Sequence, residues 1–94
     1  MPLLAGVAGM VRDGFVTGAS GRNWAGYGVE VGLDPSLPAI ARDLLTDPQT
    51  SGGLLVSCDP ASAADVLALF RAQGFDDAAV IGSIGPGAGL RVLP

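Results

Sequence analysis

LLTDPQTSGGLL, residues 44–55, runs from an apolar periodic segment through a polar turn into a second apolar segment. Pro48 restricts the backbone of the turn, and Gly52 and Gly53 let another group approach the main chain closely. The hydroxyl side chains of Thr50 and Ser51 precede the two glycines. Residues 54–58, LLVSC, have the apolar character of a short buried strand. The pattern predicts a loop with an accessible backbone that leads directly into a central strand.

Helices are expected on both sides of this loop. The upstream helix begins after Asp34 or Ser36 as N-cap, accepts Pro38 in its first turn and ends near Leu45. The downstream helix has Asp59 as N-cap, Pro60 at the first helical position and Gly74 at its end. Its apolar stripe repeats every three or four residues and consists of Ala63, Val66, Leu67 and Phe70.

The last part of the chain has strand patterns, and further elements are predicted before residue 34. Residues 78–84 and 90–93 are β-prone and are separated by the turn at residues 85–89, which predicts a terminal hairpin. Towards the amino terminus, the spacing predicts a helix over residues 3–12 with Gly14 as its left-handed cap. Residues 15–23, FVTGASGRN, are predicted to form a structured loop, and residues 27–33 an edge strand.

Together these elements predict the α+β class. The expected architecture is a two-layer α/β sandwich with a small mixed sheet, in which a β-α-β-β carboxy-terminal unit is preceded by helices and a glycine-rich loop. Residues 1–94 are expected to be a single partial domain.

Composition excludes several functions. The net charge is −4, the five basic residues are all arginine, and there is no histidine, so no basic patch is available for nucleic acid. Without histidine or lysine, the usual general base and Schiff-base nucleophile are missing. Because Cys58 is the only cysteine and no apolar run approaches a membrane span, we expect a cytoplasmic protein without a membrane partner.

Two loops are candidates for binding an anion. The amides of Gly52 and Gly53 with the hydroxyls of Thr50 and Ser51 can form a nest for an anion, or the same residues can simply make a tight turn. In the loop over residues 18–23, Arg22 can grip a phosphate through its planar fork. Alternatively, that loop has a purely structural role and is held in place by hydrogen bonds of Asn23 and by packing of Trp24.

Other reactive side chains are assigned structural roles. Asp43 and Asp47 suggest magnesium, but Asp43 lies beside Arg42 on the expected helix, and an aspartate before proline commonly starts a turn. Cys58 ends an apolar strand, so we expect a buried and inert thiol. We therefore predict no catalytic residue and no metal site in this chain.

At LLTDPQTSGGLL, and at GFVTGASGRNWAGYG over residues 14–28, the sequence resembles the selenide, water dikinases, or selenophosphate synthetases. They belong to the aminoimidazole ribonucleotide synthetase-like superfamily. The resemblance runs from the first helix to the strand at residues 80–82. The residues that match by motif come from both loops: Gly18, Gly21, Arg22, Asn23, Asp47, Pro48, Gln49, Thr50, Ser51, Gly52 and Gly53. Ala19 and Ser20 depart from the glycine and threonine of many relatives.

The resemblance implies a parent enzyme that uses ATP and magnesium to convert selenide into selenophosphate. In the family, the reactive cysteine or selenocysteine, its lysine and the metal-binding aspartates lie upstream of the matching part. We therefore expect a carboxy-terminal piece that is inactive alone and holds no cofactor, with Thr50, Ser51, Gly52, Gly53, Arg22 and Asn23 on the phosphate or nucleotide side. Its expected partners are the amino-terminal ATP-binding domain and further copies in a homo-oligomer.

Two alternatives stay open at this point. The chain can be a non-catalytic packing module whose exposed apolar face drives self-association. It can also derive from a sister ATP-using enzyme, such as aminoimidazole ribonucleotide synthetase or thiamine-monophosphate kinase, although the string Pro-Gln-Thr-Ser-Gly-Gly argues against that origin.

Overall fold

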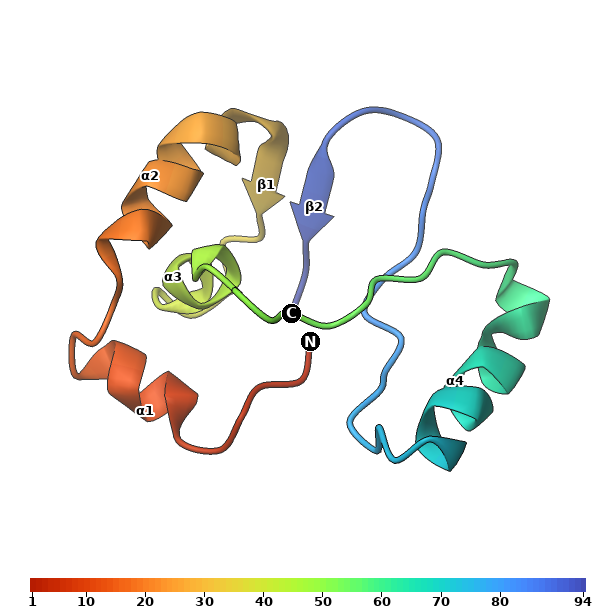
Figure 1. Ribbon diagram of the computed structural model, residues 1–94. Coiled ribbons are helices and arrows are strands. Elements are labelled where there is room, and N and C mark those ends of the chain that lie inside the picture. Colours follow the sequence, from red (N-terminus) through yellow and green to blue (C-terminus); the bar gives the residue numbers. More distant parts are fainter. The chain divides into compact units, whose positions relative to one another are not determined.

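The computed structural model describes residues 1–94, which divide into two compact units. Unit 1 consists of Met1–Leu3 and Ser51–Ile84, and unit 2 consists of Leu4–Thr50 and Gly85–Pro94. The regular elements of unit 2 are α1 (Val7–Arg12), α2 (Gly18–Tyr27), the 3-10 turn η1 (Gly28–Glu30), β1 (Val31–Leu33), α3 (Ala41–Thr46) and β2 (Leu90–Val92). Those of unit 1 are the 3-10 turn η2 (Pro60–Ser62) and α4 (Ala63–Ala72). The predicted α+β class is confirmed in this general form (Figure 1).

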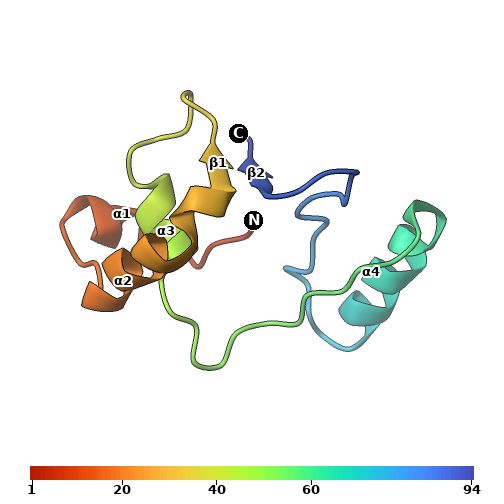
Figure 2. The ribbon, with the colours of Figure 1, turned by 90° about the horizontal axis from the view of Figure 1, so that it is seen from above.

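The sheet has two short parallel strands, β1 and β2, which lie side by side in Figures 1 and 2. Val31 pairs with Leu90 and Leu33 with Val92, and the amide of Asp34 extends the ladder to the Val92 carbonyl at 3.0 Å. The predicted hairpin is therefore wrong, because β2 pairs with a strand almost sixty positions earlier rather than with residues 78–84. The predicted edge strand over residues 27–33 is shortened to β1, because residues 27–30 belong to the end of α2 and to η1.

Both predicted glycine caps are present. Gly74 has a φ of 88°, and the amide of Phe75 donates to the Phe70 carbonyl at 3.0 Å, closing α4 with a six-residue turn. The rings of Phe70 and Phe75 pack edge to face with centroids 6.1 Å apart. Gly14 ends α1 in the same way with a φ of 90°. The capping prediction is confirmed at both helices, although α1 begins at Val7 rather than at residue 3.

The start of α4 also follows the prediction. The carboxylate of Asp59 accepts a hydrogen bond from the Ala61 amide at 2.8 Å, and Pro60 occupies the first position of η2, which continues into α4. The side chain satisfies one of the free amides at a helix start, and proline has no amide to satisfy there. Asp59 thus acts as the expected N-cap.

The largest correction concerns α2, which occupies the segment predicted to be a loop. Gly18, Ser20 and Gly21 disfavour a helix by their intrinsic propensity, and the prediction relied on that. In the structure Ser20 is 1% exposed, and its hydroxyl lies 3.3 Å from that of Thr17 at the helix start. Packing against α3 outweighs the propensity, because tertiary burial overrides local preferences of this size.

The helix predicted after Asp34 begins later than expected. The Asp34 carboxylate accepts from the Ser36 amide at 2.8 Å and from its hydroxyl at 2.6 Å, which makes a local turn instead of a helix start. Pro38 then restricts Leu37 to extended backbone. Regular α-helix begins only at Ala41, the first residue of α3.

The core of unit 2 is small and lies where α2 and α3 pack together. Ser20, Thr46 and Ala41 are the only buried residues, with 1%, 3% and 9% exposure. Unit 1 has no buried residue, and α4 shields Val66, Leu67 and Phe70 only in part. Burial of apolar area is the main stabilising contribution to folding, so unit 1 has little to hold it together alone.

Two predicted strands are not formed. Residues 54–58 and 78–84 carry no strand geometry, and Leu54, Leu55 and Ile84 are 83%, 82% and 85% exposed. The one backbone hydrogen bond of the two segments is local, from the Ala78 amide to the Phe75 carbonyl at 3.1 Å, and none joins either segment to another strand. A strand needs a neighbour to satisfy its amides and carbonyls, and neither segment has one here. Consequently the predicted mixed sheet is reduced to β1 and β2.

Candidate functional site

Asn23 joins the two motifs that the sequence singles out. From the middle of α2 its side-chain amide donates to the carbonyl of Thr46, the last residue of α3, at 2.9 Å. Thr46 is itself held by its hydroxyl, which donates to the Arg42 carbonyl at 2.8 Å. The bond therefore connects α2 to the point where the loop over residues 47–53 begins, and it uses a carbonyl that the end of a helix leaves free.

The first half of this loop belongs to unit 2. Asp47 leaves the helix with extended backbone angles, and its carboxylate accepts from the Gln49 side-chain amide at 3.1 Å. Pro48, Gln49 and Thr50 are exposed. The Thr50 hydroxyl forms no hydrogen bond within the chain, so it is free to bind a ligand.

Arg22 precedes Asn23 but is used differently. Its guanidinium folds back along α2, with one terminal nitrogen 3.5 Å from the point where a Cβ on Gly18 would stand. Arg22 is exposed and has no carboxylate partner, because the single ion pair of the structure joins Arg42 and Asp43 at 3.0 Å. A planar fork of N–H donors without an internal acceptor is suited to an external anion.

The second half of the loop, Ser51, Gly52 and Gly53, belongs to unit 1 and is exposed. Neither glycine has a positive φ, and a Cβ added at Gly53 would meet open space. The structure thus gives Gly53 no packing reason to be glycine. Of the six candidate residues, Arg22, Asn23 and Thr50 share unit 2, and Ser51, Gly52 and Gly53 lie in unit 1.

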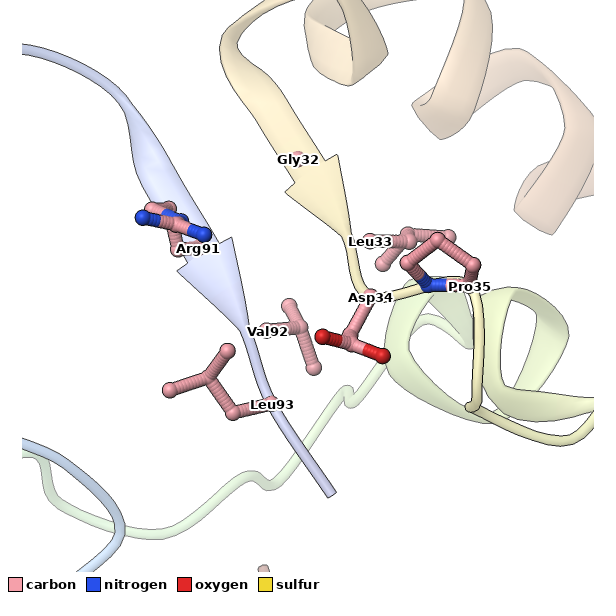
Figure 3. A pocket seen from close by; sticks show the side chains of 7 residues that line it. All are labelled: Gly32, Leu33, Asp34, Pro35, Arg91, Val92 and Leu93. Carbon is pink, nitrogen blue, oxygen red and sulfur yellow. The ribbon is translucent and has the colours of Figure 1, made fainter.

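A pocket of about 120 Å³ at the carboxyl ends of β1 and β2 was not predicted (Figure 3). Its lining residues are Gly32, Leu33, Asp34, Pro35, Arg91, Val92 and Leu93. The Asp34 carboxylate turns towards Val92, and no ion pair joins it to Arg91. The string Asp34-Pro35-Ser36 is a known signal for a side-chain turn. The parallel pairing that builds the pocket has no comparable local signal.

Asp34 is the residue whose ionisation the fold changes. The Ser36 hydroxyl and then the Ser36 amide, both donating to the carboxylate, hold the pKa of Asp34 below its ordinary value of 3.8. We expect Ser36→Ala to raise this pKa towards 3.8, because the larger of the two effects is removed and the amide remains. A carbon-detected NMR titration of the Asp34 carboxyl, in folded and in urea-unfolded chain, measures both values.

The sign of the pH dependence follows from the lowered pKa. Asp34 contributes its stabilisation fully above the pKa of the unfolded chain, and the contribution is lost as the pH falls through the lower pKa of the folded chain. Equal midpoints in the folded and unfolded chain, or an unchanged midpoint in Ser36→Ala, would contradict the hydrogen-bond assignment.

The remaining reactive groups form no centre. Cys58 is exposed, so the expected burial of its thiol is wrong; the cause is that residues 54–58 form no strand. Asp43 is paired with Arg42, and Asp47 with Gln49. No three side chains of histidine, cysteine, aspartate or glutamate come together in a geometry that could hold a metal ion. No helix is both long and apolar enough to span a membrane.

Residues 16–93, which contain both Arg22-Asn23 and the loop over residues 47–53, match the family described as AIR synthase related protein, C-terminal domain, and the chain belongs to this family. Its relatives include proteins named selenide, water dikinase. The chain is 64% identical over 84 residues to the protein of Burkholderia ambifaria, 61% over 88 residues to that of Burkholderia pseudomallei and 47% over 88 residues to that of Rhizobium meliloti. The matches cover 89%, 94% and 94% of this chain.

The same matches cover 24%, 25% and 25% of the relatives, so the chain spans about a quarter of their length. No solved structure matches the chain significantly. The family that the resemblance indicated is therefore confirmed, and the chain is a carboxy-terminal fragment related to proteins named selenide, water dikinase.

Proposed function

We propose that this chain is the carboxy-terminal portion of a selenophosphate synthetase, whose complete chain uses ATP and selenide to make selenophosphate. The observation that carries the proposal is the 64% identity to a selenide, water dikinase over 89% of this chain. Identity at this level favours the same activity over that of a sister enzyme. The chain is inactive alone, because phosphoryl transfer depends on metal ions and on positioned groups that its residues do not supply.

Within that enzyme, the loop over residues 47–53 and Arg22 lie on the phosphate side of the site. Arg22 supplies an unpaired guanidinium, Thr50 and Ser51 supply hydroxyl donors, and the exposed Gly52 and Gly53 supply backbone amides. Asn23 acts indirectly, since its amide already donates to the Thr46 carbonyl and so holds the end of α3, where the loop begins, against α2.

The magnesium ligands come from the rest of the enzyme. The two carboxylates nearest the loop are engaged, Asp43 with Arg42 and Asp47 with Gln49, and neither belongs to a cluster of oxygen ligands of the kind magnesium prefers. The family resemblance assigns ATP binding chiefly to an amino-terminal domain outside these residues. We place the complete enzyme in the cytoplasm, where ATP is available and a single exposed cysteine stays reduced.

The finer architecture is also part of the proposal. In the longer enzyme, both units belong to one partial domain with the predicted two-layer sandwich. Residues 54–58, before α4 in the chain, and residues 78–84, after it, become strands. The β-prone sequence of both segments and their unused backbone groups support this arrangement.

The activity test is a chimera in which this chain replaces the matching residues of the Burkholderia ambifaria enzyme. We expect ATP-dependent formation of selenophosphate by the chimera, observed by phosphorus NMR, and none by the 94-residue chain. Arg22→Ala in the chimera should lower kcat/KM for ATP about tenfold, the loss for one charged hydrogen bond of about 1.4 kcal/mol. Arg22→Lys should fall in between, because lysine keeps the charge without the fork.

Arg42→Ala is the matched control, since that guanidinium is occupied by Asp43 and should leave kcat/KM nearly unchanged. An inactive but folded chimera would refute the assigned function. Equal activity of Arg22→Ala and the parent chimera would remove Arg22 from the site.

A second candidate is a self-associating packing module. It is favoured by large apolar side chains that are mostly exposed, such as Leu4 at 79%, Phe15 at 75% and Leu55 at 82%. In this alternative, isolated chains form a homo-oligomer without any ATP chemistry. Sedimentation velocity over a hundredfold range of concentration distinguishes the two: a constant monomer contradicts the module, and a concentration-dependent dimer supports it.

A further inference from the structure

The two most buried side chains of unit 2 are both hydroxyls, and they lie where α2 and α3 pack together (Figures 1 and 2). Ser20 of α2 is 1% exposed, and Thr46 at the end of α3 is 3% exposed. Burying a hydroxyl costs free energy unless it is hydrogen-bonded, and no buried polar side-chain atom here lacks a partner. Apolar side chains would fill this contact at a lower cost, so the hydroxyls indicate that a particular geometry is required.

Thr46 is held by two hydrogen bonds, one to each helix. Its hydroxyl donates to the Arg42 carbonyl at 2.8 Å, and its own carbonyl accepts from the Asn23 side-chain amide at 2.9 Å. The first bond fixes Thr46 to the preceding turn of α3, and the second fixes it to α2. Asp47 follows with extended backbone. The direction in which the chain leaves α3 towards Thr50 is therefore set at this one residue.

The bond from Asn23 also fixes how α2 is turned about its own axis. Successive residues of an α-helix are about 100° apart around the axis, so Ser20 and Asn23 lie within about 60° of each other. Ser20 is buried and Asn23 is half-buried, so this side of α2 faces α3. Arg22 lies about 100° from Asn23 and is exposed. A rotation of α2 that breaks the bond to Thr46 would swing the Arg22 guanidinium in another direction.

Two groups of the proposed phosphate site thus depend on one contact. Arg22 precedes Asn23 by one residue, and Thr50 follows Thr46 by four. We infer that Thr46 is a positioning residue, which through its bond to Asn23 aligns the Arg22 guanidinium with the Thr50 hydroxyl so that both donate to one phosphate. The inference rests on the proposed function, and it adds a residue that does not itself touch the phosphate.

A double-mutant cycle in the chimera described above tests this, with kcat/KM for ATP as the readout. Asn23→Asp has nearly the shape of asparagine, but its ionised carboxylate cannot donate to the Thr46 carbonyl. We expect it to lower kcat/KM about tenfold, because small displacements of binding groups reduce rates by up to about 100-fold. In an Arg22→Ala background the same change should lower kcat/KM less than about threefold, since one of the two positioned groups is already absent.

The dependence on background separates positioning from a purely structural role. A variant that is only less folded loses the same fraction of its activity whether or not Arg22 is present. Equal losses from Asn23→Asp in the two backgrounds therefore overturn the inference.

Substitutions at Thr46 test the second hydrogen bond. Thr46→Val is similar in size but cannot donate to the Arg42 carbonyl, so it should behave as Asn23→Asp does in both backgrounds. Thr46→Ser keeps the hydroxyl and should stay within about twofold of the parent chimera. A serine variant as slow as the valine variant removes the hydroxyl from this role. Ser36→Ala is the matched control, because it removes a hydrogen-bonded hydroxyl of unit 2 outside both helices and should leave kcat/KM unchanged.

The inference and the proposed reaction fail in different ways. Selenophosphate formation with equal losses in both backgrounds leaves the reaction in place and refutes only the positioning. A chimera that makes no selenophosphate refutes the reaction, and the cycle is then repeated on the Kd for inorganic tripolyphosphate, measured by calorimetry. Binding weakened about tenfold by Asn23→Asp, and less than about threefold in the Arg22→Ala background, supports the inference. Equal losses, or no binding by the parent chimera, overturn it.

Discussion

Gly28→Ala is expected to destabilise unit 2 by about 1–3 kcal/mol, the range for overpacking a well-fitted site. A Cβ at this position would stand 2.7 Å from two atoms of the Trp24 indole, a separation that real Cβ atoms do not adopt. The backbone of Gly28 is ordinary, with a φ of −60°, so space is the only reason for glycine. Trp24 is the only tryptophan, and its fluorescence reports the displacement directly.

The measurement is urea unfolding followed by tryptophan emission. We expect a lower midpoint for Gly28→Ala, and emission at longer wavelength in the native baseline as the indole moves into water. Gly26→Ala is the matched control in α2: its Cβ meets nothing within 4 Å, and alanine is the better helix former by about 1 kcal/mol. Gly26→Ala should therefore raise the midpoint. Equal midpoints for the two variants would show that Trp24 does not pack over Gly28.

Gly89→Ala is expected to break the pairing of β1 with β2, with a loss of about 2–3 kcal/mol. Gly89 has a φ of 84°, which costs alanine about 1–2 kcal/mol. A Cβ there would also stand 3.0 Å from the Glu30 carbonyl oxygen, immediately before β1. The contact is with backbone and cannot be relieved by a rotamer change, so the strands must separate.

A series of three glycines in the same turn separates these causes. Gly85→Ala has neither a positive φ nor a neighbour within 4 Å and should be neutral. Gly87→Ala, with a φ of 118° and open space, measures backbone strain alone. Amide exchange of residues 31–33 and 90–92 should accelerate most in Gly89→Ala. The same exchange rates in Gly87→Ala and Gly89→Ala would contradict the contact with Glu30.

The sequence predicted the structure correctly where a few neighbouring residues determine the local backbone. The glycine caps at Gly14 and Gly74 and the Asp59 N-cap each depend on hydrogen bonds within six residues, so the sequence contains all the partners. The prediction failed for α2, because the weak helix propensity of its glycines and serine was outweighed by packing against α3, which begins 23 residues after the start of α2.

In the candidate site too, the residues were predicted from the sequence but the contacts between distant residues were not. Residues 47–53 and Arg22 were recognisable from their chemistry and from the family resemblance. The bond from Asn23 to the Thr46 carbonyl, which ties the two motifs together, joins positions 23 residues apart and has no local signature. The pocket beside Asp34 was missed because it exists only where β1 meets β2.

The amino-acid sequence alone determined the caps at Gly14, Asp59 and Gly74, the class of the fold and the family, since all three depend on short patterns and motif identity. Tertiary structure decided that the segment around Arg22 is helical, that β2 pairs in parallel with β1, and that residues 54–58 and 78–84 have no partner within their unit. Strand pairing and burial depend on groups distant in sequence or outside these residues. A strand-forming pattern therefore becomes a strand only when a neighbour satisfies its backbone.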